Sequence, residues 1–349
     1  MQNKSKFISV GLRPFAILVI LSLSHFLSVP LLAGQYRPED FNKLSLECQR
    51  KFQTYFQEKI GLGVRDRHLP KIYFADNPNP NYAIVYTHGL FESPNFSQGI
   101  SQNLAKSGYH TLSILLPGHW QQNLRALDEV RNTEWVTELD RAVEMAHCFA
   151  PHVILAGFSL GALLDVNKAL KDSDEISGLV LFAPALKMTW LATLGEKLGT
   201  FLGLDGNLFL RMQADHDNIP YISARAADQL YDLIDSISKA HAGVNFNFAY
   251  KAKNNDYSLS QYQIYKKIHI PVFVAYAEND PAVSDFEIRS FLHQVQGPSE
   301  SFFLKSSTGV WHGNIAKSKI DTYITSPNDY NHQFDDMTKH LNKFLATYF

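Results

Sequence analysis

Short apolar segments alternate with helix-like segments along most of this 349-residue chain. Six apolar runs have the length of strands, and they lie at 82–88, 110–117, 153–158, 177–184, 271–278 and 300–306. Helical patterns between or after these runs lie at 96–108, 133–149, 160–172 and 334–349. The apolar runs are nearly continuous, which is typical of strands buried on both faces of a parallel sheet. The pattern therefore predicts an α/β fold with a doubly wound, mostly parallel sheet.

The alternation is interrupted once, over residues 186–268, where amphipathic stretches such as 189–204 replace it. Open α/β sheets place their functional sites at the carboxyl edge of the strands. We therefore predict that 186–268 forms a helical cap inserted over that edge, between the core segments 34–185 and 269–349. A separate domain is the alternative, and we favour the cap because the strand pattern resumes immediately at Pro271.

The first 33 residues differ in character from the rest of the chain. A basic start with Lys4, Lys6 and Arg13 precedes an apolar run over 15–33, which ends in small residues. This order is typical of a secretory signal, so 1–33 predicts an exported protein, periplasmic or secreted after cleavage. The alternative is an uncleaved membrane anchor, because the apolar run approaches the ~20 residues that span a bilayer.

The chain contains two cysteines, Cys48 and Cys148. Export to an oxidising compartment would permit a disulfide between them. Two cysteines so far apart in the sequence can equally remain buried thiols, because only the fold decides whether their side chains meet. The sequence leaves both states open.

The composition excludes some classes of partner and cofactor. Charged residues make up 19% of the chain and the formal net charge is −2, with no basic block, so nucleic acid is not expected as a partner. The chain has no HExxH, no GxGxxG and no clustered Cys and His, so we expect neither a metal nor an organic cofactor. The sequence gives no signal for an oligomeric state.

One serine lies between two glycines directly after an apolar strand, in Gly157-Phe158-Ser159-Leu160-Gly161. The pattern G-x-S-x-G is typical of a tight strand-to-helix turn that holds the serine in a strained conformation. The two glycines remove side chains that would collide as strand and helix close together. The first amides of the following helix suit a developing negative charge. We therefore predict that Ser159 is a nucleophile rather than part of a plain turn.

A serine nucleophile needs a base to take its proton and an acid to orient that base. Asp280 follows the strand at 271–278, and His312 follows the last strand, in the order Ser, Asp, His that this architecture requires. Glu278 and Asp285 are the alternative acids. We prefer Asp280 because it lies at the start of the loop, ahead of a proline. His332 is the rival base, but its place near the final helix favours a surface histidine.

The oxyanion of the reaction needs two N–H donors, for which we predict the amides of Leu160 and Leu90. Leu90 follows His88-Gly89 at the end of a strand, and a glycine there lets the backbone approach the substrate closely. His88 and His119 are candidate substrate-binding residues. For His88 we favour a loop-orienting role in which its ring bonds the backbone. His119 is likewise interpreted as a structural or lining residue rather than a base.

Five motifs together resemble the α/β-hydrolases of the capped serine-esterase group, which includes monoacylglycerol lipases and lysophospholipases. The matching segments are HGLFES at 88–93, LLPGHW at 115–120, GFSLGA at 157–162, AENDPAVS at 277–284 and VWHGN at 310–314. They cover the chain from about Tyr82 to Phe349, and the cap region matches only in position and length. The resemblance implies an α/β-hydrolase fold, a catalytic triad on the same serine, aspartate and histidine, and oxyanion amides at the two leucines named above.

The chain departs from this family at two places. Relatives often carry an Asp two positions before Pro-Gly-His, where this chain has Leu115, and the glycine-rich loop after His-Gly is reduced here to Leu-Phe-Glu-Ser. Neither departure touches the triad, but both bear on the substrate.

The resulting hypothesis is hydrolysis of carboxylic esters, of acylglycerol or lysophospholipid type, compatible with contact at a membrane surface. Apolar side chains of the cap could line an acyl pocket or simply pack the cap onto the sheet. They are Leu191, Leu194, Leu198, Phe201 and Leu204. The alternatives are an amidase or aminopeptidase on the same triad, and a non-catalytic binding protein on a hydrolase scaffold. Ser159 argues against relatives that use a carboxylate nucleophile.

Overall fold

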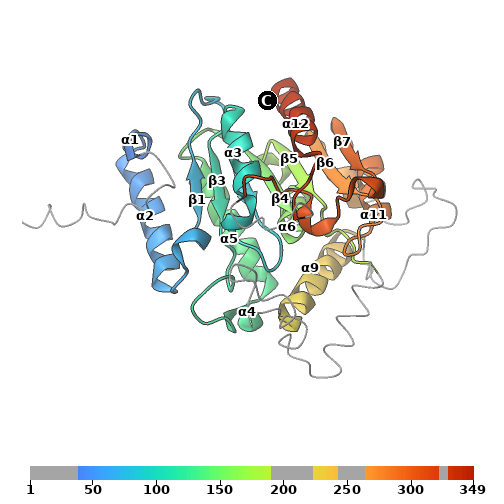
Figure 1. Cartoon of the computed structure of the whole chain (residues 1–349). Helices are drawn as coiled ribbons and strands as arrows, with labels where there is room; N and C mark the ends of the chain where they lie inside the picture. The colour runs from blue at the N-terminus through green and yellow to red at the C-terminus, as the bar shows by residue number, and fades with distance from the viewer. Residues whose placement is uncertain (1–37, 190–222, 243–263, 322–328) are drawn as a thin grey trace, which may run out of the picture. The chain divides into compact units, whose positions relative to one another are not determined.

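A single sheet organises the chain, and its strands lie in the order β1-β3-β2-β4-β5-β6-β7 (Figure 1). The computed structural model describes residues 38–189, 223–242, 264–321 and 329–349. The strands are β1 (Lys71–Tyr73), β2 (Tyr82–Thr87), β3 (Thr111–Ile114), β4 (His152–Phe158), β5 (Gly178–Phe182), β6 (Val272–Ala277) and β7 (Ser299–Leu304). β1 pairs with β3 in antiparallel orientation, and every other pair is parallel.

Helices flank this sheet as the α/β pattern predicts. The α-helices are α1 (Pro38–Phe41), α2 (Leu46–Gly61), α3 (Gln98–Lys106), α4 (Ala126–Glu129), α5 (Asn132–Ala146), α6 (Leu160–Lys171), α9 (Ala224–Ala242), α11 (Asp285–Gln294) and α12 (Phe334–Tyr348). The 3₁₀ turns are η1 (Asp66–His68), η2 (Pro94–Ser97), η3 (Ser173–Glu175), η5 (Ile264–Lys267), η6 (Ser306–Thr308) and η7 (His312–Asn314). α3 contacts α12 and α5 contacts α6. Both alternating sets of side chains on β5 and β6 are buried, so both faces of the sheet are covered at these strands.

The central strands are apolar throughout, which confirms the doubly wound, mostly parallel sheet. Strands that are covered on both faces have no solvated side, so they lack the alternation of an exposed sheet. At the edge, β7 alternates between more and less exposed residues.

Several boundaries differ from the sequence prediction. β3 ends at Ile114 rather than at residue 117, because a turn with Gly118 at φ 81° follows it. The predicted helix at 96–108 begins with the 3₁₀ turn η2, so the α-helix itself starts at Gln98. Three elements were not predicted from the sequence: β1, α2 and α11. β1 has only three residues, which is too short for a periodic pattern.

The N-terminal segment ahead of β2 packs onto the core through α2. Ser45 caps this helix, and its Oγ accepts a hydrogen bond from the Cys48 N–H at 3.2 Å. Phe52 is buried and stacks on Phe149, with ring centroids 5.2 Å apart. Lys59 Nζ lies 2.6 Å from Glu138 Oε1 on α5, in a buried ion pair. An ion pair therefore attaches α2 to α5, and a ring contact attaches it to the segment that follows α5.

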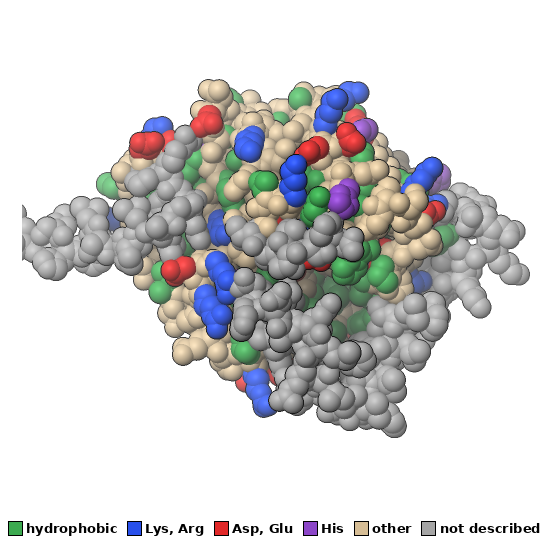
Figure 2. Space-filling model, viewed as in Figure 1, with side chains coloured by type: hydrophobic (Ala, Val, Ile, Leu, Met, Phe, Trp, Pro, Cys, Tyr) green, Lys and Arg blue, Asp and Glu red, His purple; other side chains and the backbone are tan. Residues whose placement is uncertain are grey.

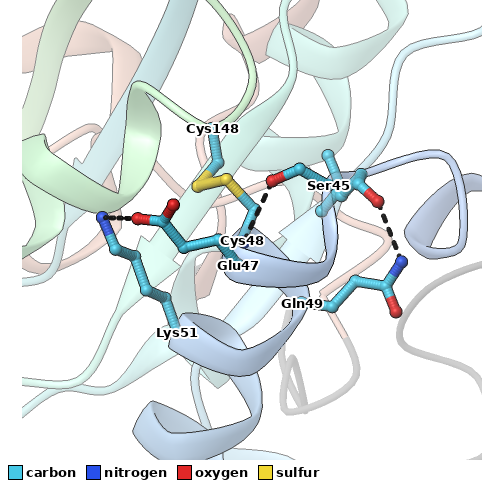
Figure 3. The surroundings of a disulfide bond; sticks show 7 residues. Ser45, Glu47, Cys48, Gln49, Lys51 and Cys148 are labelled. Atoms are coloured by element: carbon cyan, nitrogen blue, oxygen red, sulfur yellow. Dashed lines mark hydrogen bonds and ion pairs between the residues drawn. A yellow bond between two sulfur atoms is a disulfide. The ribbon is translucent and has the colours of Figure 1, made fainter.

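A disulfide also joins these two helices (Figure 3). Cys48 lies in the first turn of α2, and Cys148 follows the end of α5. The structure thereby decides the question that the sequence left open. The bridge spans a sequence separation of 100 residues, so it strongly restricts the unfolded chain.

Two predicted segments lie largely or wholly outside the described residues. The N-terminal segment 1–33 is one of them. Of the predicted cap, the structure describes 186–189, 223–242 and 264–268, which include α9 and the turn η5, and α9 contacts α4, α5 and α6. The five apolar cap residues predicted to line a pocket are outside it. Within the described ranges, no helix combines the length and the apolar character that a membrane crossing requires.

We predict that reducing the disulfide destabilises the fold. A closed loop of this size corresponds to about 4–5 kcal/mol in the loop-entropy description, so dithiothreitol should lower the thermal unfolding midpoint by several degrees. The control is the Cys48→Ser/Cys148→Ser double variant, which should show a lower midpoint that no longer responds to reductant. A native chain whose midpoint is the same with and without reductant would contradict the prediction.

A second prediction concerns Asp165 in α6. Its side chain is fully buried, and neither carboxyl oxygen has a hydrogen-bond partner in the described part of the chain. Burial raises the pKa of this carboxyl well above its usual range, so the folded state keeps a proton that the unfolded state has lost. Stability should therefore fall as pH rises from about 4 toward the folded-state pKa, by about 1.4 kcal/mol per pH unit.

Asp165→Asn cannot ionise and should lack this pH dependence. The measurement is the urea midpoint of both chains from pH 4.5 to 8. The advantage of the variant should grow with pH, and a constant difference between the chains would contradict the prediction.

Candidate active site

Ser159 lies at the sharp turn between β4 and α6, with φ 53° and ψ −109°. Residues other than glycine rarely adopt such a positive φ. Backbone hydrogen bonds hold the residue in place: its N–H donates to the Phe182 carbonyl at 3.0 Å, and its carbonyl accepts from the Ala185 N–H at 3.1 Å. The end of β5 and the loop after it therefore fix the serine from outside its own turn.

Both glycines of the motif are required sterically, as the sequence analysis expected. A Cβ at Gly161 would lie 2.1 Å from the carbonyl oxygen of Thr87 on β2. A Cβ at Gly157 would lie 2.4 Å from Asp165 Oδ2 and 2.6 Å from the Ala162 nitrogen. Any side chain at either position would push α6 away from the sheet and displace the serine.

Backbone strain is concentrated at one edge of the sheet. Five non-glycine residues of the described chain have positive φ, and each follows a different strand from β2 to β6. They are Phe91 (70°), Trp120 (53°), Ser159 (53°), Ala183 (42°) and Asn279 (54°). Because β2 to β6 are parallel, their carboxyl ends share one edge, where open α/β sheets place their sites. Strained residues persist where the surrounding structure holds them, and they cluster at functional sites.

The structure brings the predicted nucleophile, base and acid together. His312 Nε2 lies 2.9 Å from Ser159 Oγ, and His312 Nδ1 lies 2.9 Å from Asp280 Oδ2. The other carboxylate oxygen, Asp280 Oδ1, accepts from the N–H groups of Ala282 at 2.8 Å and Val283 at 3.1 Å. The acid is thus held at both oxygens, and the three side chains form a continuous relay that can move the serine proton to the imidazole.

The relay is largely shielded from solvent. Ser159 and Asp280 are 6% and 5% exposed, and the His312 side chain is 15% exposed. The His312 ring lies against Phe158, with ring centroids 5.0 Å apart. The hydrogen bonds that join the three side chains are stronger in such surroundings than they would be in water.

The rival acids and the rival base have other partners. Glu278 is half-buried and accepts hydrogen bonds from the N–H and hydroxyl of Ser306, which lower its pKa. Asp285 begins α11 and pairs with Arg289 at 3.1 Å. His332 is exposed and lies beside the ring of Tyr330. These contacts place all three side chains outside the relay.

The two predicted oxyanion amides lie on backbone segments that flank the serine. Leu160 is the first residue of α6, where N–H groups have no acceptor within the helix. The segment before Leu90 is packed against the serine turn, since a Cβ at Gly89 would lie 3.4 Å from the Ser159 Cβ and 2.7 Å from the Phe158 ring. The two segments that carry these amides therefore lie next to one another at the serine turn.

His88 is fully buried and both of its ring nitrogens bond the backbone. Nδ1 lies 2.8 Å from the Gly89 carbonyl, and the Leu116 N–H donates to Nε2 at 3.1 Å. A carbonyl only accepts, so the proton lies on Nδ1. Burial, helped by nearby His119, lowers the pKa of His88 well below its usual range. These bonds favour the loop-orienting role and leave His88 no ring nitrogen for a substrate.

His119 is also buried, and Nδ1 lies 3.0 Å from the Pro117 carbonyl. Trp135 Nε1 donates to the same carbonyl at 3.1 Å. Burial lowers the pKa of His119 to about 4, so its imidazole is neutral near pH 7. Nε2 has no hydrogen-bond partner among the described residues, and substrate binding by His119 stays a prediction.

Glu92 was missed in the sequence analysis. It accepts from the Gly89 N–H at 3.5 Å and pairs with Lys317 at 3.4 Å, which connects the loop after β2 with the segment that follows His312. Burial raises its pKa, and Lys317 works in the opposite direction. No periodic pattern marked Glu92, because its partner lies far along the chain.

Among the described residues, no group of three His, Cys, Asp or Glu side chains could hold a metal ion.

The chain is similar to phospholipase YtpA of Bacillus subtilis (strain 168), with 28% identity over 162 residues. The similarity covers 44% of this chain and 61% of that protein, so this chain spans less than two thirds of the relative's length.

Three solved structures show the same fold at low sequence identity. A monoacylglycerol lipase from Paleococcus ferrophilus matches with a TM-score of 0.56 and 16% identity, over 80% of this chain and 98% of that one. A soluble variant of monoglyceride lipase from Saccharomyces cerevisiae matches with a TM-score of 0.55 and 16% identity, over 79% and 90%. A structure from the metagenome-derived lipolytic enzymes LipS and LipT matches with a TM-score of 0.54 and 12% identity, over 81% of this chain and 99% of that one.

These likenesses confirm the predicted α/β-hydrolase fold. Residues 78–316, more than half of the chain, match the family described as serine aminopeptidase, S33. With its parallel sheet and its serine held at the turn between β4 and α6, the chain belongs to this family of α/β hydrolases.

Proposed function

We propose that the protein hydrolyses carboxylic esters through Ser159, His312 and Asp280. The observation that carries the proposal is the pair of 2.9 Å hydrogen bonds that joins the hydroxyl, the imidazole and the carboxylate in one relay. The strained turn that presents the serine supports the same assignment.

In the first step, His312 Nε2 removes the hydroxyl proton as Ser159 Oγ forms a bond to the carbonyl carbon of the ester. Asp280 orients the imidazole and stabilises its positive charge. The carbonyl oxygen becomes an oxyanion, which the amides of Leu90 and Leu160 would stabilise. Losing one such donor costs about 3 kcal/mol in serine hydrolases.

The tetrahedral intermediate then collapses. The bond from carbon to the alcohol oxygen breaks, and His312 gives its proton to the departing alcohol, which leaves an acyl group on Ser159. A water molecule attacks this acyl-enzyme while His312 takes a water proton. The bond from carbon to Ser159 Oγ then breaks, His312 gives that proton to Ser159 Oγ, and the carboxylic acid is released. The cycle consumes one water and restores all three side chains.

The proposed substrates are acylglycerols or lysophospholipid-like esters with a medium or long acyl chain. Relatives named as a phospholipase and as monoacylglycerol lipases support this class. The proposal includes a helical cap over 186–268 that bounds the acyl pocket. The family also bears the description of an aminopeptidase, so amide hydrolysis is the second candidate.

We further propose that the protein acts outside the cytoplasm. The disulfide between Cys48 and Cys148 supports this location, because such bridges persist in oxidising compartments. The basic and apolar segment 1–33 supports export as well.

The charges on the described face in Figure 2 are of both signs and interspersed, which agrees with a small ester substrate rather than a polyanion.

The first prediction here concerns the relay. Ser159→Ala should lower kcat for p-nitrophenyl esters by about 10⁶ and Asp280→Asn by about 10⁴, as in other serine hydrolases. A fluorophosphonate should label the native chain and leave Ser159→Ala unlabelled.

The rival side chains supply matched controls for this experiment. Glu278→Gln and His332→Gln remove an acid and an imidazole that lie outside the relay, and both should keep the native rate. Ester turnover that survives in Ser159→Ala, or that disappears in Glu278→Gln, would contradict the assignment.

The second prediction concerns the substrate. Across p-nitrophenyl esters from acetate to palmitate, Ser159-dependent kcat/KM should peak at eight or more acyl carbons, because an apolar pocket gains about 0.8 kcal/mol per buried methylene. A peak at acetate or butyrate would overturn the long-chain proposal. Faster turnover of matched amides than of esters would favour the aminopeptidase alternative.

A further inference from the structure

The loop that carries one proposed oxyanion amide contains a strained residue. Phe91 has φ 70°, in the region that favours glycine, and it lies directly after Leu90. Ser93, two residues later, caps the turn η2, and its Oγ accepts from the Asn95 N–H at 3.3 Å. A loop in this conformation needs contacts from elsewhere in the fold, because strain persists only where the surroundings hold it.

His68 supplies such a contact. Its Nδ1 lies 2.8 Å from Ser93 Oγ, and the ring is fully buried. The same ring stacks on Trp120, with centroids 3.6 Å apart and planes inclined by 13°. Trp120 is itself strained, with φ 53°, and belongs to the loop after β3. One imidazole therefore touches two strained loops at the carboxyl edge of the sheet.

The state of His68 fits a fixed contact rather than proton transfer. Burial, with the charges of Arg67 and Lys71, lowers its pKa to about 3, so the ring is neutral near pH 7. Its Nδ1 is already bonded to Ser93, and its Nε2 is buried with no hydrogen-bond partner in the described chain.

His68 belongs to the segment 38–77, which lies ahead of the family match at 78–316. This segment also reaches the loop after β3 through α2, since the Leu115 N–H lies 3.4 Å from the Tyr55 hydroxyl oxygen. Tyr55 is buried beside the Lys59–Glu138 ion pair, and the disulfide anchors the same helix. Residues 38–77 therefore help to hold both the loop after β2 and the loop after β3.

We propose that His68 is a positioning residue: it holds the loop 88–93 so that the Leu90 amide can meet the oxyanion. This inference rests on the proposed ester hydrolysis and extends it to a segment outside the family match. The stacked ring and the bond to Ser93 each contribute to holding the loop.

The test separates these two contacts with substitutions of similar size. His68→Asn keeps a hydrogen-bonding group near the Nδ1 position but loses the stacked ring, and His68→Phe keeps a ring on Trp120 but loses the bond. Complete loss of an oxyanion donor costs about 10²–10³ in kcat, so a misplaced donor should cost about tenfold in His68→Ala and less in the other two variants. KM should stay within about twofold of the native value, because the lost interaction forms only in the transition state.

His110→Phe is the control matched to His68→Phe. His110 Nδ1 accepts from the Ala75 N–H at 3.0 Å, so this histidine also ties the N-terminal segment to the core. It lies next to the amino end of β3, away from the carboxyl edge where Ser159 lies. The control should lower the unfolding midpoint and leave kcat unchanged. Equal kcat losses in the control and in His68→Phe would overturn the proposal.

Hydrogen exchange of the 88–97 segment gives a readout that does not depend on turnover. Exchange there should quicken in His68→Ala and His68→Phe and stay native in His110→Phe. Unchanged exchange in all His68 variants would overturn the positioning role, whatever the kinetics. If the native chain shows no Ser159-dependent ester turnover, the proposed function fails, and hydrogen exchange alone decides whether His68 holds the loop.

Discussion

The close approach of α6 to the sheet is the constraint on which the site depends. The helix starts so near β2 that only a hydrogen fits at Gly161, where a Cβ would lie 2.1 Å from the Thr87 carbonyl oxygen. This contact forces the chain to reverse sharply at Ser159 and places the Leu160 amide at the first turn of the helix. The same closeness brings the turn against Gly89 in the neighbouring loop. One steric condition thereby locates the nucleophile and both backbone segments proposed to receive the oxyanion.

The strained loops around this turn depend on a rigid surrounding. Residues in such conformations cost of order 1–3 kcal/mol each, which an isolated loop could not sustain. The fully buried strands β5 and β6 hold the loops that follow them. Residues 38–77 help to hold the loops after β2 and β3, through His68 and Tyr55. A disulfide and a buried ion pair fasten that segment to α5, so the support is itself firmly attached.

Most of the sheet could be predicted from the sequence because buried parallel strands have an unmistakable apolar pattern. The elements that escaped prediction lack such a pattern. β1 has three residues, and α11 covers only ten residues with mixed polar and apolar side chains. The strand ends were predicted less well than the strands themselves. β3 stops early because the chain turns at Gly118, which depends on how the loop packs rather than on its hydrophobicity.

The sequence by itself determined the sharp turn at Ser159 and the order of serine, acid and histidine. These follow from short local patterns and from the order of the strands along the chain. Only the tertiary structure decided which acid meets the base. Glu278 and Asp280 follow the same strand two residues apart, and one turns toward Ser306 while the other reaches His312. The disulfide and the contact of His68 with the oxyanion loop were likewise beyond the sequence. Such contacts join residues far apart along the chain, so their geometry exists only once the intervening segments have packed.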